Sequence, residues 1–126
     1  ALNAADGGTI NVWGLPASNT VLRAYGGTIN VLGRATTIGG VYIAQGTTGF
    51  FGVVNFLSNQ GSGVTLTLTT VKIYSAGCTL NIPGYRAIVA TNNILLAYGL
   101  TLADITLILP AAHASTTALI KHEVLF

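Results

Sequence analysis

The sequence predicts one all-β domain, with a β-sandwich or jelly-roll-like arrangement preferred and a β-solenoid as the close alternative. Short segments alternate apolar and polar residues with a period of two, as half-buried strands do. Glycine pairs, Asn92-Asn93 or a proline separate these segments, which recur at the short, regular intervals typical of all-β domains. The length of 126 residues suffices for a single domain spanning 1–126, in which residues 1–8 could form an extended arm.

Strands of four to eight residues follow from this alternation. Valine and leucine alternate with threonine between 64 and 69, and the phase slips at Thr69-Thr70, which indicates a turn or bulge. The helical candidate, Leu100 to Asp104, is long enough for one short turn only. The strands are expected near 9–13, 20–24, 28–32, 41–45, 50–57, 64–69, 71–75, 78–82, 86–90, 93–98, 105–109 and 117–125.

An internal echo is the clearest long-range signal. The segment Gly7 to Gly14 returns as Gly26 to Gly33, with seven of eight positions identical. A fixed shift of this size is typical of stacked solenoid coils of about 19 residues. Nothing comparably exact follows Gly33, so a duplicated hairpin or two equivalent strands of a sandwich is the preferred interpretation.

In either arrangement the glycine pairs of the echo mark corners, namely Gly7, Gly8, Gly26 and Gly27. Glycine is favoured at corners because it adopts positive φ without steric cost. Replacement of Gly27 by valine is expected to disrupt assembly if that corner needs positive φ.

The alternation also predicts which side chains point inward. On each expected strand the apolar phase should face the core, because one face of a half-buried strand is shielded from water. The predicted core face is Ile10, Val12, Ile29, Val31, Leu66, Leu68, Ile73, Leu80, Ile105 and Leu107.

Charge is scarce. Charged residues make up 6% of the chain against 51% apolar residues, and the net charge is +2. The cations stand singly, so no basic stripe exists for nucleic acid, and glycines interrupt the uncharged stretch between Arg34 and Lys72, so no membrane span is expected. A small domain so composed would expose large apolar patches, which predicts that other copies of the chain cover much of its surface.

The chain has few side chains that could act in catalysis. We therefore expect that it is not an enzyme and has no cofactor and no metal site. Cys78 is the only cysteine, which excludes an intrachain disulfide and favours a small buried apolar role. His113 and His122 lack the spacing of a metal pair, and Lys121-His122-Glu123 is typical of a charged edge strand. No arrangement along the chain forces a nucleophile and a base together among Asp6, Cys78, Asp104, His113, His122 and Glu123.

Threonine suggests a surface function of another class. The chain has 17 threonines, and Thr65, Thr67 and Thr69 form a regular row that could present hydroxyl and methyl groups as an ice-binding or carbohydrate-binding face does. Threonine is equally the β-branched residue that tolerates both solvent and a partner's surface. A lectin-like module should also have a polar, aromatic-lined pocket, which the sequence does not locate.

The stretch Asp104-Ile-Thr-Leu-Ile-Leu-Pro-Ala-Ala112, followed by Thr117 to Lys121, resembles a strand, Leu-Pro-Ala-Ala turn and strand pattern of bacteriophage tail-fibre and head-decoration β-domains. The resemblance covers about 20 of the 126 residues. It implies a small β-domain that trimerises or decorates a larger assembly, and it carries over no catalytic residue.

These observations together predict a non-enzymatic structural subunit of a repetitive assembly. The preferred function is a virion decoration, fibre or coat protein, located in the virion, whose partners are copies of itself in a trimer or higher assembly and other virion proteins. The alternative is a subunit of an extracellular or cell-surface filament or pilus polymerised by strand donation. The second alternative is a lectin-like or ice-binding surface module.

Overall fold

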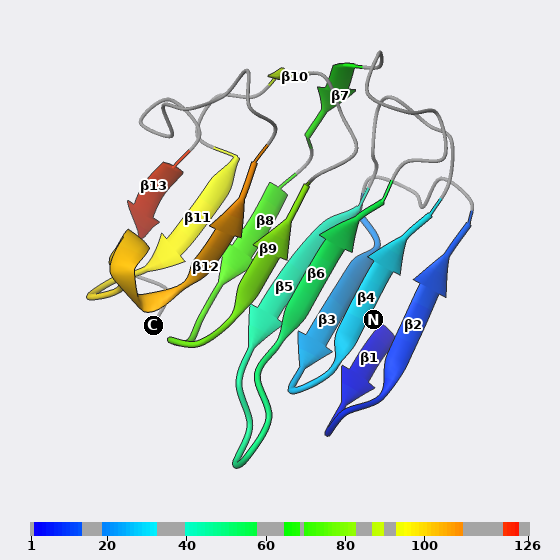
Figure 1. The fold of residues 1–126 in the computed structure, drawn as a ribbon, viewed down its shortest axis with the longest axis vertical. Helices are drawn as coiled ribbons and strands as arrows, with labels where there is room; N and C mark the ends of the chain where they lie inside the picture. The colour runs from blue at the N-terminus through cyan, green and yellow to red at the C-terminus, as the bar shows by residue number, and fades with distance from the viewer. Residues whose placement is uncertain are drawn as a thin grey trace.

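Strands one coil apart in the sequence lie side by side and run parallel in the computed structural model, which describes residues 2–13, 19–32, 40–57, 65–68, 70–82, 87–89, 93–109 and 120–123. The chain runs down a strand of one sheet, turns a corner and runs up a strand of a second sheet, again and again (Figure 1). All ten strand pairings are parallel in this part of the chain. The fold is a parallel β-solenoid with coils of about 23 residues.

Two large sheets and one small sheet form the coils. Sheet A has the order β1 (Leu2–Ala5), β3 (Val21–Tyr25), β5 (Val41–Gln45), β8 (Thr70–Ile73), β11 (Ile94–Ala97) and β13 (Ile120–Glu123). Sheet B has the order β12 (Thr106–Ile108), β9 (Thr79–Asn81), β6 (Val53–Phe56), β4 (Thr28–Val31) and β2 (Thr9–Val12). The third pairs β7 (Thr65–Thr67) with β10 (Ala87–Val89), and one 3-10 turn, η1 (Leu102–Asp104), precedes β12.

The preferred sandwich or jelly-roll-like arrangement is therefore wrong. Those folds are built from antiparallel strands, whereas here each strand pairs with its equivalent one coil later. The twelve expected strands each overlap an observed strand, and the expected short helical turn is η1, so the error concerns pairing and not the elements. Residues 2–5, for which an extended arm was considered, form β1 and pair with β3.

Coil length varies along the chain. Thr9 pairs with Thr28 at the spacing of the internal echo, but the coils that join Thr28 to Val53 and Val53 to Thr79 are longer. A hairpin closed by Thr47 and Phe50 lengthens the coil between β5 and β6. The coil length expected from the echo thus fits the spacing of β1, β3 and β5 on sheet A and of β2 and β4 on sheet B, and the later coils are longer.

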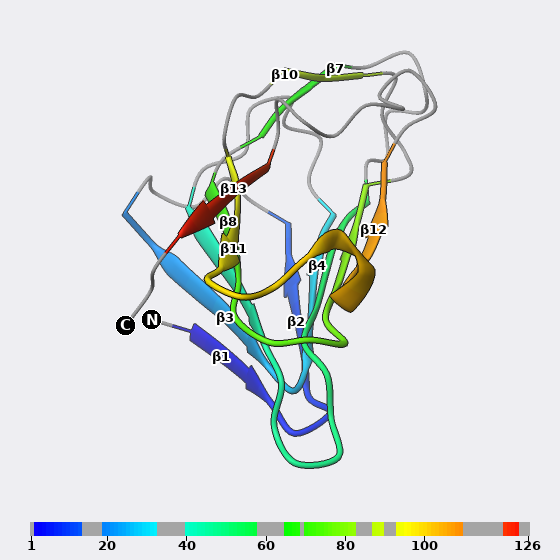
Figure 2. The same cartoon turned by 90° about the vertical axis from the view of Figure 1, so that its left-hand side faces the viewer.

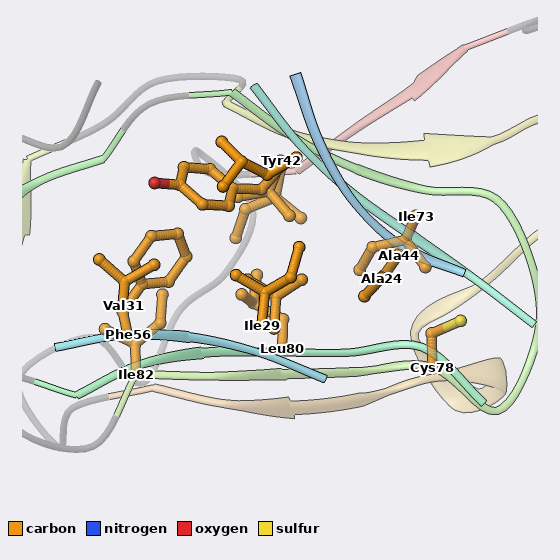
Figure 3. Close-up of a cluster of buried hydrophobic side chains, with 14 of the residues drawn as sticks. Ala24, Ile29, Val31, Tyr42, Ala44, Phe56, Ile73, Cys78, Leu80 and Ile82 are labelled. Atoms are coloured by element: carbon orange, nitrogen blue, oxygen red, sulfur yellow. The ribbon is translucent and has the colours of Figure 1, made fainter. Parts of the chain in front are cut away.

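The core lies between the two sheets, which approach each other at one edge and diverge toward β7 and β10 (Figure 2). Each inward row repeats small or aliphatic side chains, for example Ala4, Ala24 and Ala44 on sheet A. Tyr42 and Phe56 fill the wider part, with ring centroids 5.2 Å apart in an edge-on contact (Figure 3). Because buried apolar area dominates folding free energy, these rows hold the coils together.

The edge where the chain passes from sheet A to sheet B, made of residues 5–8, 25–27, 45–52, 74–78 and 97–105, is called the crossing edge here. It forms the lower end of the molecule in Figure 1. Equivalent residues stack along it, since the amide of Thr28 donates to the carbonyl of Gly8, that of Val53 to Gly27 and that of Thr79 to Gly52, all at 2.9 Å. A Cβ at Gly27 would lie against the carbonyl oxygen of Ala4 and 2.7 Å from that of Gly8, so only glycine fits there.

Candidate functional surfaces

The outer face of sheet B is flat and uncharged, with two rows that run across the strands. One row is Thr9, Thr28, Val53, Thr79 and Thr106, and the other is Asn11, Asn30, Asn55, Asn81 and Ile108. Strands in a sheet lie about 4.8 Å apart, and alternate residues along a strand about 6.6 Å apart. The face is therefore a two-dimensional array of hydroxyl, methyl and amide groups.

Asn11, Asn30 and Asn55 form a hydrogen-bonded ladder, whereas the Oδ1 atom of Asn81 in the same row is buried and has no hydrogen-bond partner among the described residues. The amide of Asn30 donates to the side-chain oxygen of Asn11 at 3.1 Å, and the amide of Asn55 donates to that of Asn30 at 2.9 Å. An amide both donates and accepts, so identical residues in register satisfy one another. The ladder fixes these side chains in one orientation.

The outer face of sheet A is arranged differently. Its long row runs Asn3, Arg23, Ile43, Lys72 and Leu95, with Lys121 at the next register position. Ile43 points away from the core cluster, yet only 6% of its surface is exposed. The stems of Arg23 and Lys72, which flank it, are long enough to cover it.

A hollow of about 340 Å³ opens on the same face, beside β1, β3 and β5. It is lined by two side-chain amides, a guanidinium, a phenol ring and one methyl group, which belong to Asn3, Gln45, Arg23, Tyr25 and Ala5. The Nε atom of Arg23 is buried and has no hydrogen-bond partner among the described residues. None of the described residues that line the hollow is a carboxylate.

The crossing edge carries most of the exposed large apolar side chains. Eight such side chains are found among the described residues, and five of them lie on this edge: Tyr25, Phe50, Phe51, Tyr98 and Leu102. Its two carboxylates have partners within the chain, since Asp6 accepts from the hydroxyl of Thr47 at 3.0 Å and Asp104 from the amide of Thr101 at 2.8 Å. The edge is thus largely aromatic and apolar, and its two carboxylates are hydrogen-bonded to neutral groups of the chain.

The hairpin phenylalanines sit on glycines. A Cβ at Gly7 would lie 3.2 Å from the ring of Phe50, and a Cβ at Gly77 would lie against the ring of Phe51. Both glycines have positive φ, +84° and +85°, which L side chains rarely adopt. The corner glycines therefore also provide the surface on which the aromatic rings rest.

Two titratable groups lie in the core. Burial raises the pKa of Tyr42 to about 12, and the Tyr42 hydroxyl has no hydrogen-bond partner among the described residues. Burial also raises the pKa of the Cys78 thiol, an effect opposed by hydrogen bonds to the backbone of Gly52 and Ser75. Cys78 is fully buried, so the expectation of a small buried apolar role is confirmed, and its raised pKa disfavours the nucleophilic thiolate.

The predicted corner glycines all lie on the crossing edge. Gly7 and Gly26 have positive φ, whereas Gly8 and Gly27 do not. The positive φ considered for Gly27 is therefore wrong, and the close approach of the Ala4 carbonyl is what requires glycine there.

The predicted core face divides into two groups. Six of its residues are buried: Ile29, Val31, Leu66, Leu68, Ile73 and Leu80. The other four are half-buried and pack against the core cluster: Ile10, Val12, Ile105 and Leu107.

The regular threonine row lies elsewhere than expected. Thr67 is exposed on β7, but Thr69 is outside the described residues. The row that the fold creates crosses the strands of sheet B. A sequence signal for it exists, because a small residue, Thr or Val, an aliphatic residue and Asn recur in order at Gly8–Asn11, Gly27–Asn30, Gly52–Asn55 and Cys78–Asn81.

The C-terminal motifs contribute little to these surfaces. The strand part of the Asp104 to Lys121 stretch forms β12, while His113 lies outside the described residues. Lys121, His122 and Glu123 belong to β13, which pairs with β11.

Comparison of the chain with protein-family models, curated proteins and solved structures finds no match. Within the described ranges, no helix is long and apolar enough to cross a membrane. The same part of the chain holds no cluster of three or more His, Cys, Asp or Glu side chains suited to a metal ion.

Proposed function

We propose that this chain is a non-enzymatic structural subunit of a repetitive assembly, of the virion fibre or decoration type, in which copies meet along the crossing edge. The observation that carries the proposal is the row of exposed aromatic and aliphatic side chains on that edge. Exposed apolar surface that gathers on one side of a protein marks interaction sites, and aromatic residues are enriched at the centres of protein interfaces.

A second copy is the occupant that fits this edge. Apart from Asp6 and Asp104, whose carboxylates accept hydrogen bonds within the chain, the described residues of this edge are uncharged. Apolar, neutral surfaces are self-complementary, as a symmetric homo-oligomer requires. The resemblance of Asp104 to Lys121 to virion β-domains supports the same function, and a filament differs from it only in that the contact does not close.

The test compares assembly of the wild type with that of two matched variants. The crossing-edge variant combines Phe51→Ser and Tyr98→Ser, whose side chains are 62% and 78% exposed. The control is Trp13→Ser, because Trp13 is 66% exposed but follows the last residue of β2, at the end of that strand opposite the crossing edge. Light scattering after chromatography, with circular dichroism to verify folding, measures the mass of each.

We expect the wild type to form an oligomer at micromolar concentration. The dissociation constant of the crossing-edge variant should rise about tenfold or more, whereas the Trp13→Ser control should assemble like the wild type. Electron microscopy of the same fractions separates a closed trimer or ring from an open filament. A monomeric wild type, or assembly lost in the Trp13 variant alone, would refute the proposal.

The threonine and asparagine array on sheet B favours one second function, binding to ice. Its rows repeat at the regular spacing of the strands, and Thr28, Thr79 and the Asn ladder are held by the sheet. Thermal hysteresis measures this function, with Thr28→Lys expected to abolish it and Thr67→Lys, on β7, to leave it unchanged. No hysteresis in the wild-type protein would exclude this candidate.

A further inference from the structure

We infer that the hollow on the outer face of sheet A is a binding site for a carboxylated sugar, such as a uronic acid residue of an acidic polysaccharide. The hollow adjoins the crossing edge, since Ala5, Tyr25 and Gln45 of its lining belong to that edge and Asn3 and Arg23 do not. The inference nevertheless draws on other observations than the proposed assembly, because Phe50, Phe51, Tyr98 and Leu102 do not line the hollow. It rests on which side chains the strand register brings together.

The register creates the hollow. Leu2, Leu22 and Tyr42 are equivalent positions in successive coils, so the outward residues beside them also stack. Asn3 therefore lies next to Arg23, and Ala5 lies next to Tyr25, which lies next to Gln45. Ala5 has only a methyl group in a row of long side chains, and its short side chain leaves room beside Tyr25.

The guanidinium of Arg23 gives the hollow its preference for an anion. Its Nε–H is buried without an acceptor among the described residues, and no acid lines the hollow. Arg23 is the charged residue among those that line the hollow, so the hollow favours an anion over a neutral ligand. Arginine binds carboxylates through two parallel hydrogen bonds, in a planar geometry that lysine cannot reproduce.

The remaining side chains suit a sugar. Tyr25 is partly exposed and offers both a ring face and a hydroxyl, while the amides of Asn3 and Gln45 can each donate to and accept from sugar hydroxyls. A small inorganic anion can accept hydrogen bonds from Arg23 and the amides, but it leaves their acceptor oxygens and the ring face of Tyr25 unused. The volume of about 340 Å³ is at the small end of ligand sites, as expected for one sugar residue of a polymer.

Isothermal titration calorimetry of the full chain tests the inference. The acidic probes are trigalacturonate and sialyllactose, the neutral probe is the methyl ester of trigalacturonate, and the inorganic probe is sulfate. Two variants change Arg23: Arg23→Gln removes the positive charge, and Arg23→Lys keeps the charge but lacks the planar pair of N–H donors. A third variant, Ala5→Leu, fills the hollow. The matched control is Lys72→Gln, which removes a cation from the same row two strands away.

At least one acidic probe should bind about tenfold more tightly than the neutral ester or sulfate. Arg23→Gln and Ala5→Leu should each weaken this binding about tenfold or more, Arg23→Lys should weaken it less than Arg23→Gln, and Lys72→Gln should change it less than twofold. The inference is overturned if neither acidic probe binds, if sulfate or the ester binds equally well, or if Lys72→Gln is as harmful as Arg23→Gln. Circular dichroism establishes that each variant is folded.

Discussion

Sheet B stacks the same polar side chain from one coil to the next, whereas sheet A alternates cations with apolar residues. On sheet B, Asn11, Asn30 and Asn55 are consecutive and hydrogen-bonded. On sheet A, Ile43 separates Arg23 from Lys72. Both rows have the same parallel register, so the difference lies in which side chains tolerate a copy of themselves as a neighbour.

The difference shows why charge is scarce in this chain. Equivalent positions of a parallel solenoid lie about 4.8 Å apart, where two like charges repel by about 1 to 3 kcal/mol. A spacing of two strands brings the separation to about 10 Å, the screening length at moderate salt. Asn, Thr and aliphatic residues carry no such cost. The low charge content therefore follows partly from the fold. For this reason the proposed assembly rests on the exposed aromatic side chains and not on the scarcity of charge.

The largest expected effect comes from breaking the register that both faces share. Gly27→Val would place a Cβ against the Ala4 carbonyl and close to that of Gly8, at the corner that joins the two sheets. Because backbone atoms cannot move aside as a flexible side chain would, we expect a loss of about 4 kcal/mol or more, or no folding at all. Urea denaturation of the purified variant measures the loss.

Gly46→Ala is the matched control for Gly27→Val. The φ of Gly46 is not positive, and the nearest atom to its added Cβ would be the Phe50 carbonyl oxygen, at an ordinary 3.4 Å. We expect a change below about 1 kcal/mol there. A Gly27 variant as stable as this control would mean that the corner can open without loss of register.

The next largest effect tests the alternation on sheet A. Ile43→Lys would put cations on three consecutive strands, with the new lysine between Arg23 and Lys72, and would also remove a side chain that is almost fully covered. We expect a loss of about 2 to 3 kcal/mol, part of which high salt restores. Ile43→Gln loses similar burial without the charge, so its stability should respond to salt as the wild type does. Equal salt dependence in the two variants would contradict the explanation by charge.

The same register explains how far the sequence could predict this fold. Alternation of period two is a property of each strand, and it located the strand near 28–32 that the structure places at Thr28–Val31. It does not state whether the neighbour runs parallel or antiparallel. That information lies in the recurrence of Gly-Thr-Ile-Asn, which the hairpin between β5 and β6 obscures by lengthening the coil that joins Thr28 to Val53.

The candidate sugar site was beyond sequence analysis for a related reason. Arg23 and Gln45 are distant in the sequence and belong to no common motif. Only the pairing of Leu2 with Leu22 and of Leu22 with Tyr42 brings Asn3, Arg23 and Gln45 to one hollow. Side chains that converge through register become visible only once the register is known.

The smallest effect, with the opposite sign, concerns the core between the two faces. On sheet B the amides of Asn11, Asn30 and Asn55 are hydrogen-bonded to one another, but the buried Tyr42 hydroxyl, like the Oδ1 atom of Asn81, has no partner among the described residues. Tyr42→Phe removes that hydroxyl and keeps the edge-on ring contact with Phe56, so we expect a gain of about 1 kcal/mol at neutral pH. The gain is measured as a higher midpoint of urea unfolding.

Unfolding at alkaline pH shows whether the stability gained in Tyr42→Phe comes from removing the unpartnered hydroxyl or from a change in packing. The pKa of Tyr42 is about 12 in the folded chain and 10 when unfolded, so the folded state holds its proton more tightly between these values. Ionisation of Tyr42 therefore does not affect stability below pH 10, and wild-type stability falls by about 2 to 3 kcal/mol as pH rises from 10 through 12. The Phe variant lacks this group and should lose correspondingly less stability over the same range. Parallel alkaline curves for the two proteins would show that the Tyr42 hydroxyl reaches an acceptor or water, and the contrast between the hydrogen-bonded side chains of Asn11, Asn30 and Asn55 and the unpartnered hydroxyl in the core would then disappear.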